Sequence, residues 1–178
     1  MKKKAIFFDR DGIVNERIFD GYVKTIDEFV FEFHFFELFK LIKELGYMAV
    51  LVTNQQCINK GIITENKLIE IHNFMQEQLL KNTGCNFDEI YYCPDLADSN
   101  SKYRKPETGM FDAAIEKYNI DVKNSWTIGD AITDVMAGKK VQTQTILVGS
   151  FEKIAEADFI FQDIKNVVEF FKQFRTYT

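Results

Sequence analysis

Two aspartates, Asp9 and Asp11, stand two positions apart directly after the apolar run AIFF, and Gly12 follows them. A glycine at this point lets the chain turn sharply, so that both carboxylates can face the same space. One carboxylate could then attack an electrophilic substrate while the other moves a proton. The pattern therefore indicates a catalytic pair, with an acidic surface turn as the alternative that these residues alone leave open.

A third aspartate, Asp130, follows the run WTIG, and Asp134 lies four residues beyond it. Carboxylates that converge on one point repel each other unless a cation lies among them, and a site made of oxygen ligands suits Mg²⁺. We therefore expect Asp9, Asp11 and Asp130 to bind Mg²⁺. If a helix begins after Asp130, Asp134 comes onto the same side and can support the metal ligands.

Groups that could hold a phosphate follow two other apolar segments. Thr53 and Asn54 offer a hydroxyl and an amide, which can hydrogen-bond phosphoryl oxygens without adding charge, although a threonine there is more often a turn residue. Arg104 and Lys105 add positive charge, and Pro106 keeps the residue before it extended, so that the Lys105 ammonium is aimed. Each of these signals is ordinary alone, and their order along the chain carries the prediction.

The elements that must position these groups can be predicted from apolar spacing. Strands are expected over 5–8, 48–52, 89–92, 126–128, 145–148 and 158–161, and helices over 35–45 (ended by Gly46), 68–79 (capped by Thr64), 110–117 and 167–174. Nearly all-apolar strands that alternate with helices are typical of an α/β fold with a doubly wound parallel sheet. Ligands of such sheets bind at the carboxyl ends of the strands, so the polar groups above should meet at one rim.

Length and composition favour a single domain over residues 1–178, with little room for a separate cap domain between the polar segments. The net charge of −5 would not attract a polyanion, so we expect no nucleic-acid partner. No apolar run approaches membrane-spanning length, and three widely spaced cysteines suit reduced thiols, so we expect no membrane partner and a cytoplasmic location. The sequence carries no signal for an oligomeric state.

These segments, in this order, resemble the four motifs of the haloacid dehalogenase superfamily over nearly the whole chain. The matching residues are Asp9-Arg-Asp11-Gly12, Thr53, Lys105, and Gly129-Asp130 with Asp134. The resemblance implies a Rossmann-like core and a phosphatase that forms an aspartyl-phosphate. Asp9 would attack phosphorus, and Asp11 would protonate the leaving oxygen and then activate water. Thr53 and Lys105 would hold the phosphoryl group, and Asp130 would bind Mg²⁺ beside Asp9 and the backbone carbonyl of Asp11.

Longer strings resemble the D-glycero-D-manno-heptose 1,7-bisphosphate phosphatases within this superfamily. They are residues 9–15, 21–23, 52–55, 91–94, and 104–106 with 109–110. The resemblance implies a small phosphorylated sugar as the substrate, with contacts from Gly21, Tyr22, Asn54, Gln55 and Arg104. Histidinol-phosphate phosphatases and polynucleotide 3'-phosphatases share the elements at 54–55 and 104–106, so their substrates stay as alternatives.

The chain departs from the family where a zinc loop is often found. Cys93 is kept, but Asp95, Ser101 and Tyr103 stand where a histidine and two cysteines are usual. One thiolate cannot make a structural zinc site. We therefore expect no zinc and a loop held by its own packing, through Tyr103 and Pro94.

Two more departures concern the rim, where Gln56 replaces a usual serine and Ala131 a usual lysine. Loss of that lysine removes a positive charge near the phosphate and could redirect specificity. The two histidines, His34 and His72, do not adjoin a motif, so they are expected to be structural.

A protein of another class, a phosphoacceptor signalling domain, also uses Mg²⁺, an aspartate, a threonine and a lysine on a parallel sheet. Its phosphorylated aspartate follows the third strand. Here Asp88 precedes the third predicted strand and Asp95 lies in the loop beyond it. The motif order therefore favours the enzyme, and the presence of every residue that the chemistry requires disfavours a silent binding protein.

Overall fold

The computed structural model describes residues 2–151 and 156–177, in which strands and helices alternate along the chain. The strands are β1 (Ala5–Phe8), β2 (Met48–Asn54), β3 (Glu89–Cys93), β4 (Trp126–Gly129), β5 (Gln144–Val148) and β6 (Phe159–Phe161). The α-helices are α1 (Phe35–Glu44), α2 (Glu65–Thr83), α3 (Gly109–Tyr118), α4 (Ile132–Lys140) and α5 (Ile164–Lys172). Short 3₁₀ helices are η1 (Ile26–Glu28), η2 (Val122–Asn124) and η3 (Gln173–Tyr177). Each predicted strand is present within two residues of its expected bounds.

The six strands form one parallel sheet in the order β3-β2-β1-β4-β5-β6, which confirms the predicted doubly wound α/β fold. From β1 the chain builds outward to β3, returns to the other side of β1 with β4, and builds outward again. This reversal between β1 and β4 is the switch point at which such sheets bind ligands. Phe8 is in register with Ile128, and the Asp9 amide donates to the Ile128 carbonyl at 3.0 Å. The residues after β1 and β4 therefore lie side by side.

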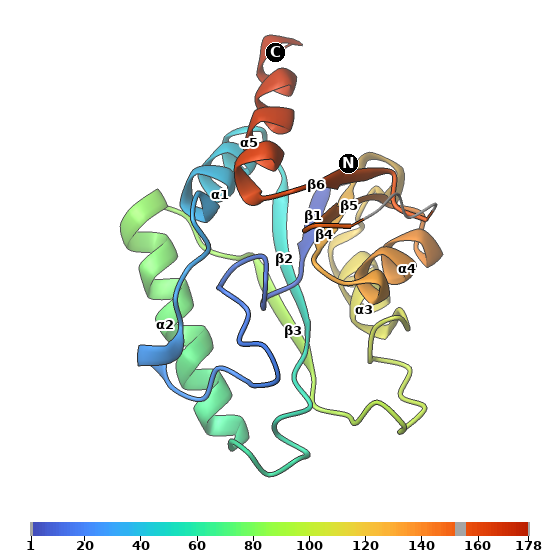
Figure 1. Ribbon diagram of the computed structural model, residues 1–178. Coiled ribbons are helices and arrows are strands. Elements are labelled where there is room, and N and C mark those ends of the chain that lie inside the picture. The colour runs from blue at the N-terminus through green and yellow to red at the C-terminus, as the bar shows by residue number, and fades with distance from the viewer. Residues whose placement is uncertain (1, 152–155, 178) are drawn as a thin grey trace.

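Helices cover both faces of the sheet, with α1, α2 and α5 on one face and α3 and α4 on the other (Figure 1). Alternate residues of a strand point to opposite faces. Ile6 and Phe8 accordingly pack toward the first group of helices, whereas Ala5 and Phe7 pack toward the second. All four residues of β1 are completely buried. Burial on both faces explains why the strands are unbroken apolar runs in the sequence.

The ends of the helices follow local chemistry. The Thr64 hydroxyl accepts from the Lys67 amide at 3.2 Å and caps α2, as predicted, and Gly46 takes a positive φ of 77° just after α1. The last helix differs from the prediction, since α5 begins at Ile164 rather than at residue 167. The reason is that the Asp163 carboxylate accepts from the Asn166 amide at 2.9 Å and caps the helix there.

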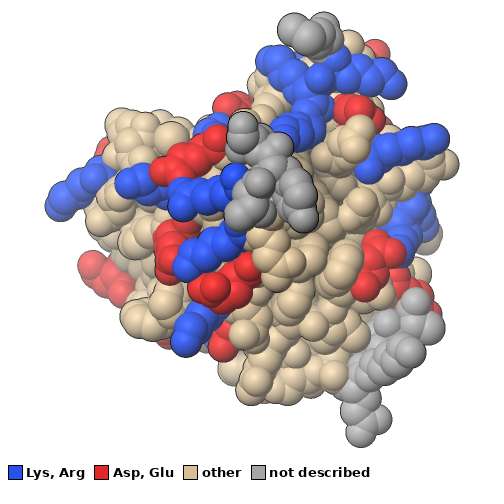
Figure 2. All heavy atoms as spheres, turned by 90° about the horizontal axis from the view of Figure 1, so that it is seen from above, with Lys and Arg blue, Asp and Glu red and all other residues tan. Residues whose placement is uncertain are grey.

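The surface seen from above Figure 1 carries mixed charge. On the part of this face that undescribed residues do not cover, lysines and arginines are interspersed with aspartates and glutamates (Figure 2). Binding to a nucleic-acid backbone uses clustered basic groups, which is a different pattern. Among the described helices, none combines the length and the apolar character needed to cross a membrane.

Candidate active site

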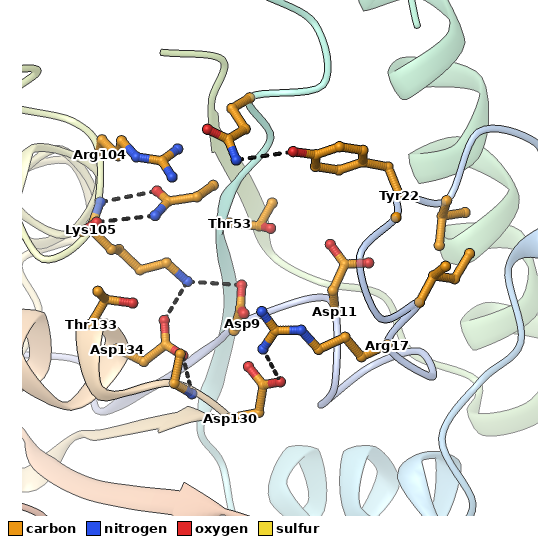
Figure 3. Close-up of a pocket in the computed structure, with 16 residues that line it drawn as sticks. Asp9, Asp11, Arg17, Tyr22, Thr53, Arg104, Lys105, Asp130, Thr133 and Asp134 are labelled. Carbon is orange, nitrogen blue, oxygen red and sulfur yellow. Dashed lines mark hydrogen bonds and ion pairs between the residues drawn. The ribbon is translucent and has the colours of Figure 1, made fainter. Parts of the chain in front are cut away.

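The crevice at the switch point is a polar cavity of about 200 Å³ that reaches from the ends of β1 and β4 to the loops above them. Its walls include ten of the eleven residues predicted for the site, which are Asp9, Asp11, Gly21, Tyr22, Thr53, Asn54, Arg104, Lys105, Asp130 and Asp134 (Figure 3). Gln55 is the exception. It is buried behind the wall, where its amide donates to Asp11 and to the Thr53 hydroxyl, both at 2.9 Å.

The turn after β1 is pressed against the loop after β4. Gly12 has a φ of 91°, and a Cβ atom on it would lie 2.2 Å from the Asp130 Oδ2 atom. Only glycine tolerates both this conformation and this approach. Gly12 is thus required by the packing of two strand ends that are far apart in the chain.

Lys105 is the central cation of the cavity, with 3% of its surface exposed. Its ammonium lies 2.8 Å from Asp9 Oδ1, 2.7 Å from Asp134 Oδ1 and 2.7 Å from the Val52 carbonyl. Burial alone would lower the pKa of Lys105, but Asp134 and Asp9 outweigh it and raise the pKa above its ordinary value. Lys105 therefore stays charged at every physiological pH.

Asn54 fixes the backbone that carries this lysine. Its amide nitrogen donates to the Lys105 carbonyl at 3.1 Å, and its amide oxygen accepts from the Lys105 amide at 3.0 Å. Asn54 lines the cavity as predicted, yet both ends of its amide are used on Lys105. The lysine is therefore aimed by a side chain from β2, 51 positions earlier in the sequence.

Carboxylate oxygens of Asp9, Asp130 and Asp134 lie within 4.8 Å of one another. Both Asp134 oxygens are occupied, one by Lys105 and the other by the Ala131 amide at 3.0 Å. Asp130 differs, because Oδ2 accepts from Arg17 while Oδ1 is buried with no hydrogen-bond partner among the described residues. A buried carboxylate oxygen without a partner is costly unless a cation or a donor reaches it.

These contacts fit a divalent cation held by Asp9 and Asp130. The free Asp130 Oδ1 offers one oxygen ligand, and the Asp9 oxygen that does not face Lys105 offers another. Asp134, with both oxygens engaged, can support the site but has none to spare. Within the described part of the chain the Asp11 carboxylate is not one of the three that gather here, and its predicted metal contact stays a prediction.

The two motif aspartates have opposite electrostatic surroundings. Burial, helped by Asp134 and Asp130 and opposed by Lys105, raises the pKa of Asp9 to about 7. Burial alone would also raise the pKa of Asp11, but the Arg10 guanidinium and hydrogen bonds from Asn15, Arg10 and Gln55 hold that pKa below its ordinary value. Even beside Lys105, Asp9 thus needs a further cation to stay fully ionised at neutral pH, whereas Asp11 does not.

Arg10 and His72 lie next to the Asp11 carboxylate, and sequence reasoning did not identify either of them as part of the site. Arg10 is completely buried, with Nη2 at 2.9 Å from Asp11 Oδ1 and Nη1 at 3.3 Å from His72 Nε2. Burial and then Arg10 lower the pKa of His72 to about 3, so the imidazole is neutral. His72 was expected to be structural and remote from the motifs, but α2 brings it against the first one. Its place on the apolar face of α2, between Ile71 and Met75, is the signal that could have indicated burial.

Arg17 is a further residue that no motif predicts. Its guanidinium lies 2.7 Å from Asp130 Oδ2, and half of its side chain is exposed. Figure 3 shows the side chain reaching from the loop after β1 toward Asp130 and Asp9. Within this structure an arginine therefore partly neutralises the acidic group that fits a metal.

The loop after β3 is held by polar contacts. Cys93 Sγ lies 3.5 Å from Asp95 Oδ2 and 3.7 Å from Ser101 Oγ, and Arg104 Nη1 donates to the Asp95 carbonyl at 2.9 Å. The expected packing through Tyr103 is wrong, since that side chain is 55% exposed. The positions that correspond to zinc ligands in the family thus meet each other here through hydrogen bonds.

The chain is similar to known proteins over nearly its whole length. Residues 102–166 match the family described as HAD-hydrolase-like. The chain is 36% identical to a D-glycero-beta-D-manno-heptose-1,7-bisphosphate 7-phosphatase of Helicobacter pylori, over 95% of this chain and 98% of the relative. It is 35% identical to a D-glycero-alpha-D-manno-heptose-1,7-bisphosphate 7-phosphatase of Campylobacter jejuni, over 97% of this chain and 98% of the relative.

A solved structure shows the same architecture. The fold matches the D,D-heptose 1,7-bisphosphate phosphatase from B. bronchiseptica, which was crystallised in complex with magnesium and phosphate, with a TM-score of 0.87. The two chains are 27% identical, and the match covers 96% of this chain and 98% of that one. The similarity therefore extends over both halves of the sheet and includes the crevice between β1 and β4.

Proposed function

Because this chain belongs to the haloacid dehalogenase-like hydrolase family and is a phosphatase, we propose that it removes the 7-phosphate of a D-glycero-D-manno-heptose 1,7-bisphosphate, with Mg²⁺ as its cofactor. The relatives named for this reaction match nearly the whole chain. The observation that carries the proposal is the group at the switch point: Asp9 beside a buried lysine, and Asp130 with one oxygen free. Such a group can bind a phosphate ester and attack it.

Asp9 is the proposed nucleophile. Its carboxylate attacks phosphorus, the bond from phosphorus to the sugar oxygen breaks, and an aspartyl-phosphate forms. Lys105 and the Thr53 hydroxyl hold the phosphoryl oxygens, and the lysine offsets negative charge as it spreads over them. Thr53 is suited to this role because its hydroxyl already accepts from Gln55, which leaves its hydrogen for a ligand.

Asp11 is the proposed acid and base. The leaving sugar oxygen takes a proton from Asp11, and the resulting carboxylate then takes a proton from the water that attacks the aspartyl-phosphate. Arg10, Asn15 and Gln55 hold Asp11 as a carboxylate here, which is the form needed for the second half of the reaction. For the first half Asp11 must gain a proton, and it then gives up part of its pairing with Arg10.

Asp9 and Asp130 are the carboxylates proposed to hold Mg²⁺, and Asp134 supports them from below. When bound, the ion supplies positive charge that polarises the phosphoryl group and keeps Asp9 ionised. The chain itself contributes two oxygens of suitable type at the carboxyl ends of β1 and β4. Zinc is not expected, so metal analysis of the purified protein should find well under one zinc per chain.

Substrate screening with the purified chain tests this function. We expect Mg²⁺-dependent release of phosphate from the heptose bisphosphate with a kcat/KM at least tenfold above that for histidinol phosphate or a 3'-phosphorylated oligonucleotide. EDTA should abolish the release, and added Mg²⁺ should restore it. Preferred hydrolysis of either alternative substrate would contradict the proposed substrate, and activity that survives EDTA would contradict the proposed cofactor.

A further inference from the structure

The Asp11 carboxylate is held by donors on side chains that do not line the cavity. Oδ1 accepts from Arg10 Nη2 at 2.9 Å and from Asn15 Nδ2 at 3.0 Å. Oδ2 accepts from Arg10 Nη2 at 3.0 Å and from Gln55 Nε2 at 2.9 Å. The three donor side chains are buried, whereas Asp11 lines the cavity with 28% of its side chain exposed. The direction in which Asp11 points therefore depends on the buried groups behind it.

Arg10 is fixed at both of its ends. Its carbonyl accepts from the amides of Ile13, Val14 and Asn15 at 3.3, 2.8 and 3.1 Å, which fixes the turn that carries it. At the other end, Nη1 contacts His72 Nε2 at 3.3 Å, while Nη2 stays on Asp11. A guanidinium is planar, so an acceptor for Nη1 sets how the whole group is turned toward Asp11.

His72 can serve as this acceptor only in one form. Arginine has donors and no acceptor, so Nε2 must carry no hydrogen, and the neutral imidazole must carry its hydrogen on Nδ1. Burial and then Arg10 lower the pKa of His72 to about 3, which agrees with the neutral form. The ring is 5% exposed and packs edge-on against Tyr92, with 6.0 Å between the ring centres. The imidazole is thus an acceptor held in a fixed place.

We propose that His72 is a positioning residue that acts through Arg10 and keeps Asp11 aimed into the cavity, where Asp11 protonates the leaving oxygen. This inference rests on the proposed acid role of Asp11. His72 is not among the residues that line the cavity, so it touches no substrate. Without its acceptor, a buried N–H of Arg10 loses its partner, which is costly, and the guanidinium turns to find another. Because Asp11 is bonded to the same guanidinium, its carboxylate moves too.

The test uses the ratio of kcat/KM for the heptose 1,7-bisphosphate to kcat/KM for p-nitrophenyl phosphate. A sugar oxygen needs a proton from Asp11 as it leaves, whereas nitrophenolate leaves without one, and Asp9 attacks phosphorus in both. His72→Leu removes the acceptor and should lower the ratio about tenfold, because only the step that needs a well-aimed acid is slowed. His72→Gln keeps an acceptor near Arg10 and should hold the ratio within about twofold of the original protein.

Met75→Ala is the matched control for a loss of packing. Met75 is completely buried on the same helix, α2, and its truncation destabilises the fold without removing an acceptor from Arg10. We expect its ratio to equal that of the original protein. Thermal unfolding of each variant confirms that its chain is folded at the assay temperature.

Two further variants separate this inference from the proposed function. Asp11→Asn should lower the ratio at least as far as His72→Leu, and an unchanged ratio would show that Asp11 is not the acid, so that both proposals fail. If Asp11→Asn lowers the ratio but His72→Leu does not, or His72→Gln does not restore it, only the positioning role is overturned. In an Arg10→Met background His72→Leu should have no further effect, and a further fall would show that His72 does not act through Arg10. If the original protein prefers another alkyl phosphate, that ester takes the place of the heptose bisphosphate in the ratio, because its oxygen needs the same proton.

Discussion

The cavity has two unlike sides, which we call the floor (Asp9, Lys105, Asp130 and Asp134) and the mouth (Tyr22, Gln56 and Arg104). Lys60 donates to the Tyr22 hydroxyl next to the mouth. The floor is nearly buried, and its lysine contacts two of its three carboxylates. The mouth is built by loops after β1, β2 and β3, and Lys60 beside it has no carboxylate partner among the described residues. From this difference we expect the reaction to take place at the floor and the choice of phosphate ester to depend on the mouth.

The largest effect should come from Asp9→Asn, because it removes the nucleophile from the floor. An amide cannot form the aspartyl-phosphate, so we expect kcat to fall roughly 10³-fold or more. Phosphate release under saturating substrate measures the change. Asp20→Asn is a matched control, since Asp20 lies on an exposed turn with a φ of 55° that asparagine also tolerates. Retained hydrolysis in purified Asp9→Asn would refute the nucleophile and with it the floor as the reacting side.

The second effect concerns the charge balance of the floor. Lys105→Met leaves Asp9 and Asp134 without their buried partner, so kcat should fall about 10²-fold. The protein without metal should also lose roughly 3 kcal/mol of unfolding free energy, as expected when one member of a buried ion pair is removed. Kinetics and chemical denaturation measure the two effects.

The matched control for this variant is Lys102→Met, which removes an exposed lysine from the same loop. Added Mg²⁺ should recover part of the stability of Lys105→Met, because it supplies positive charge to the same carboxylates. An unchanged unfolding free energy would show that Lys105 is not needed to balance the floor.

The sequence allowed the floor to be predicted far better than the mouth. Asp9 and Asp130 could be identified because they follow apolar runs, and Lys105 because it directly precedes a proline; parallel strands bring their carboxyl ends to one edge. Lys60 and Arg17 could not, because their positions depend on loop contacts with Tyr22 and Asp130 that have no periodic pattern. The strands and helices were predictable because apolar spacing marks them. The predicted start of α5 was wrong because a side-chain cap, the Asp163 carboxylate, and not apolar spacing sets where this helix begins.

A third prediction concerns the buried network under the floor, where His72 contacts Arg10. The pKa of His72 is about 3 in the fold and near 6.5 when unfolded, so below pH 6.5 the unfolded chain binds the extra proton. Stability is therefore lost as the pH falls from 6.5 toward 3 and is unaffected above this range. His72→Gln keeps an acceptor near Arg10 but cannot be protonated. Between pH 7 and pH 5, the free energy of unfolding of the original protein should therefore fall by about 2 kcal/mol more than that of His72→Gln.

Denaturant unfolding at several pH values measures this difference. Taking the difference between the two proteins cancels the titration of Asp9, which has the opposite sign because its pKa is raised. His34→Gln is the control, since His34 is not buried and pairs with Glu37 at 3.1 Å. Parallel pH profiles for the original protein and His72→Gln would mean that the imidazole is not held neutral.

The smallest effect tests the boundary between the two sides, where Arg17 reaches from a loop onto Asp130. Mg²⁺ must bind beside a guanidinium that already occupies one oxygen of that carboxylate, and ion pairs with this exposure contribute at most about 1 kcal/mol. Arg17→Gln should therefore tighten Mg²⁺ binding up to about fivefold in calorimetric titrations of the metal-free protein. Lys24→Gln, which removes a charge from the same loop where it pairs with Glu28, should not change the affinity. Weaker binding in Arg17→Gln would reverse the interpretation: Arg17 would then hold one oxygen of Asp130 so that the other faces the ion, and it would belong to the floor.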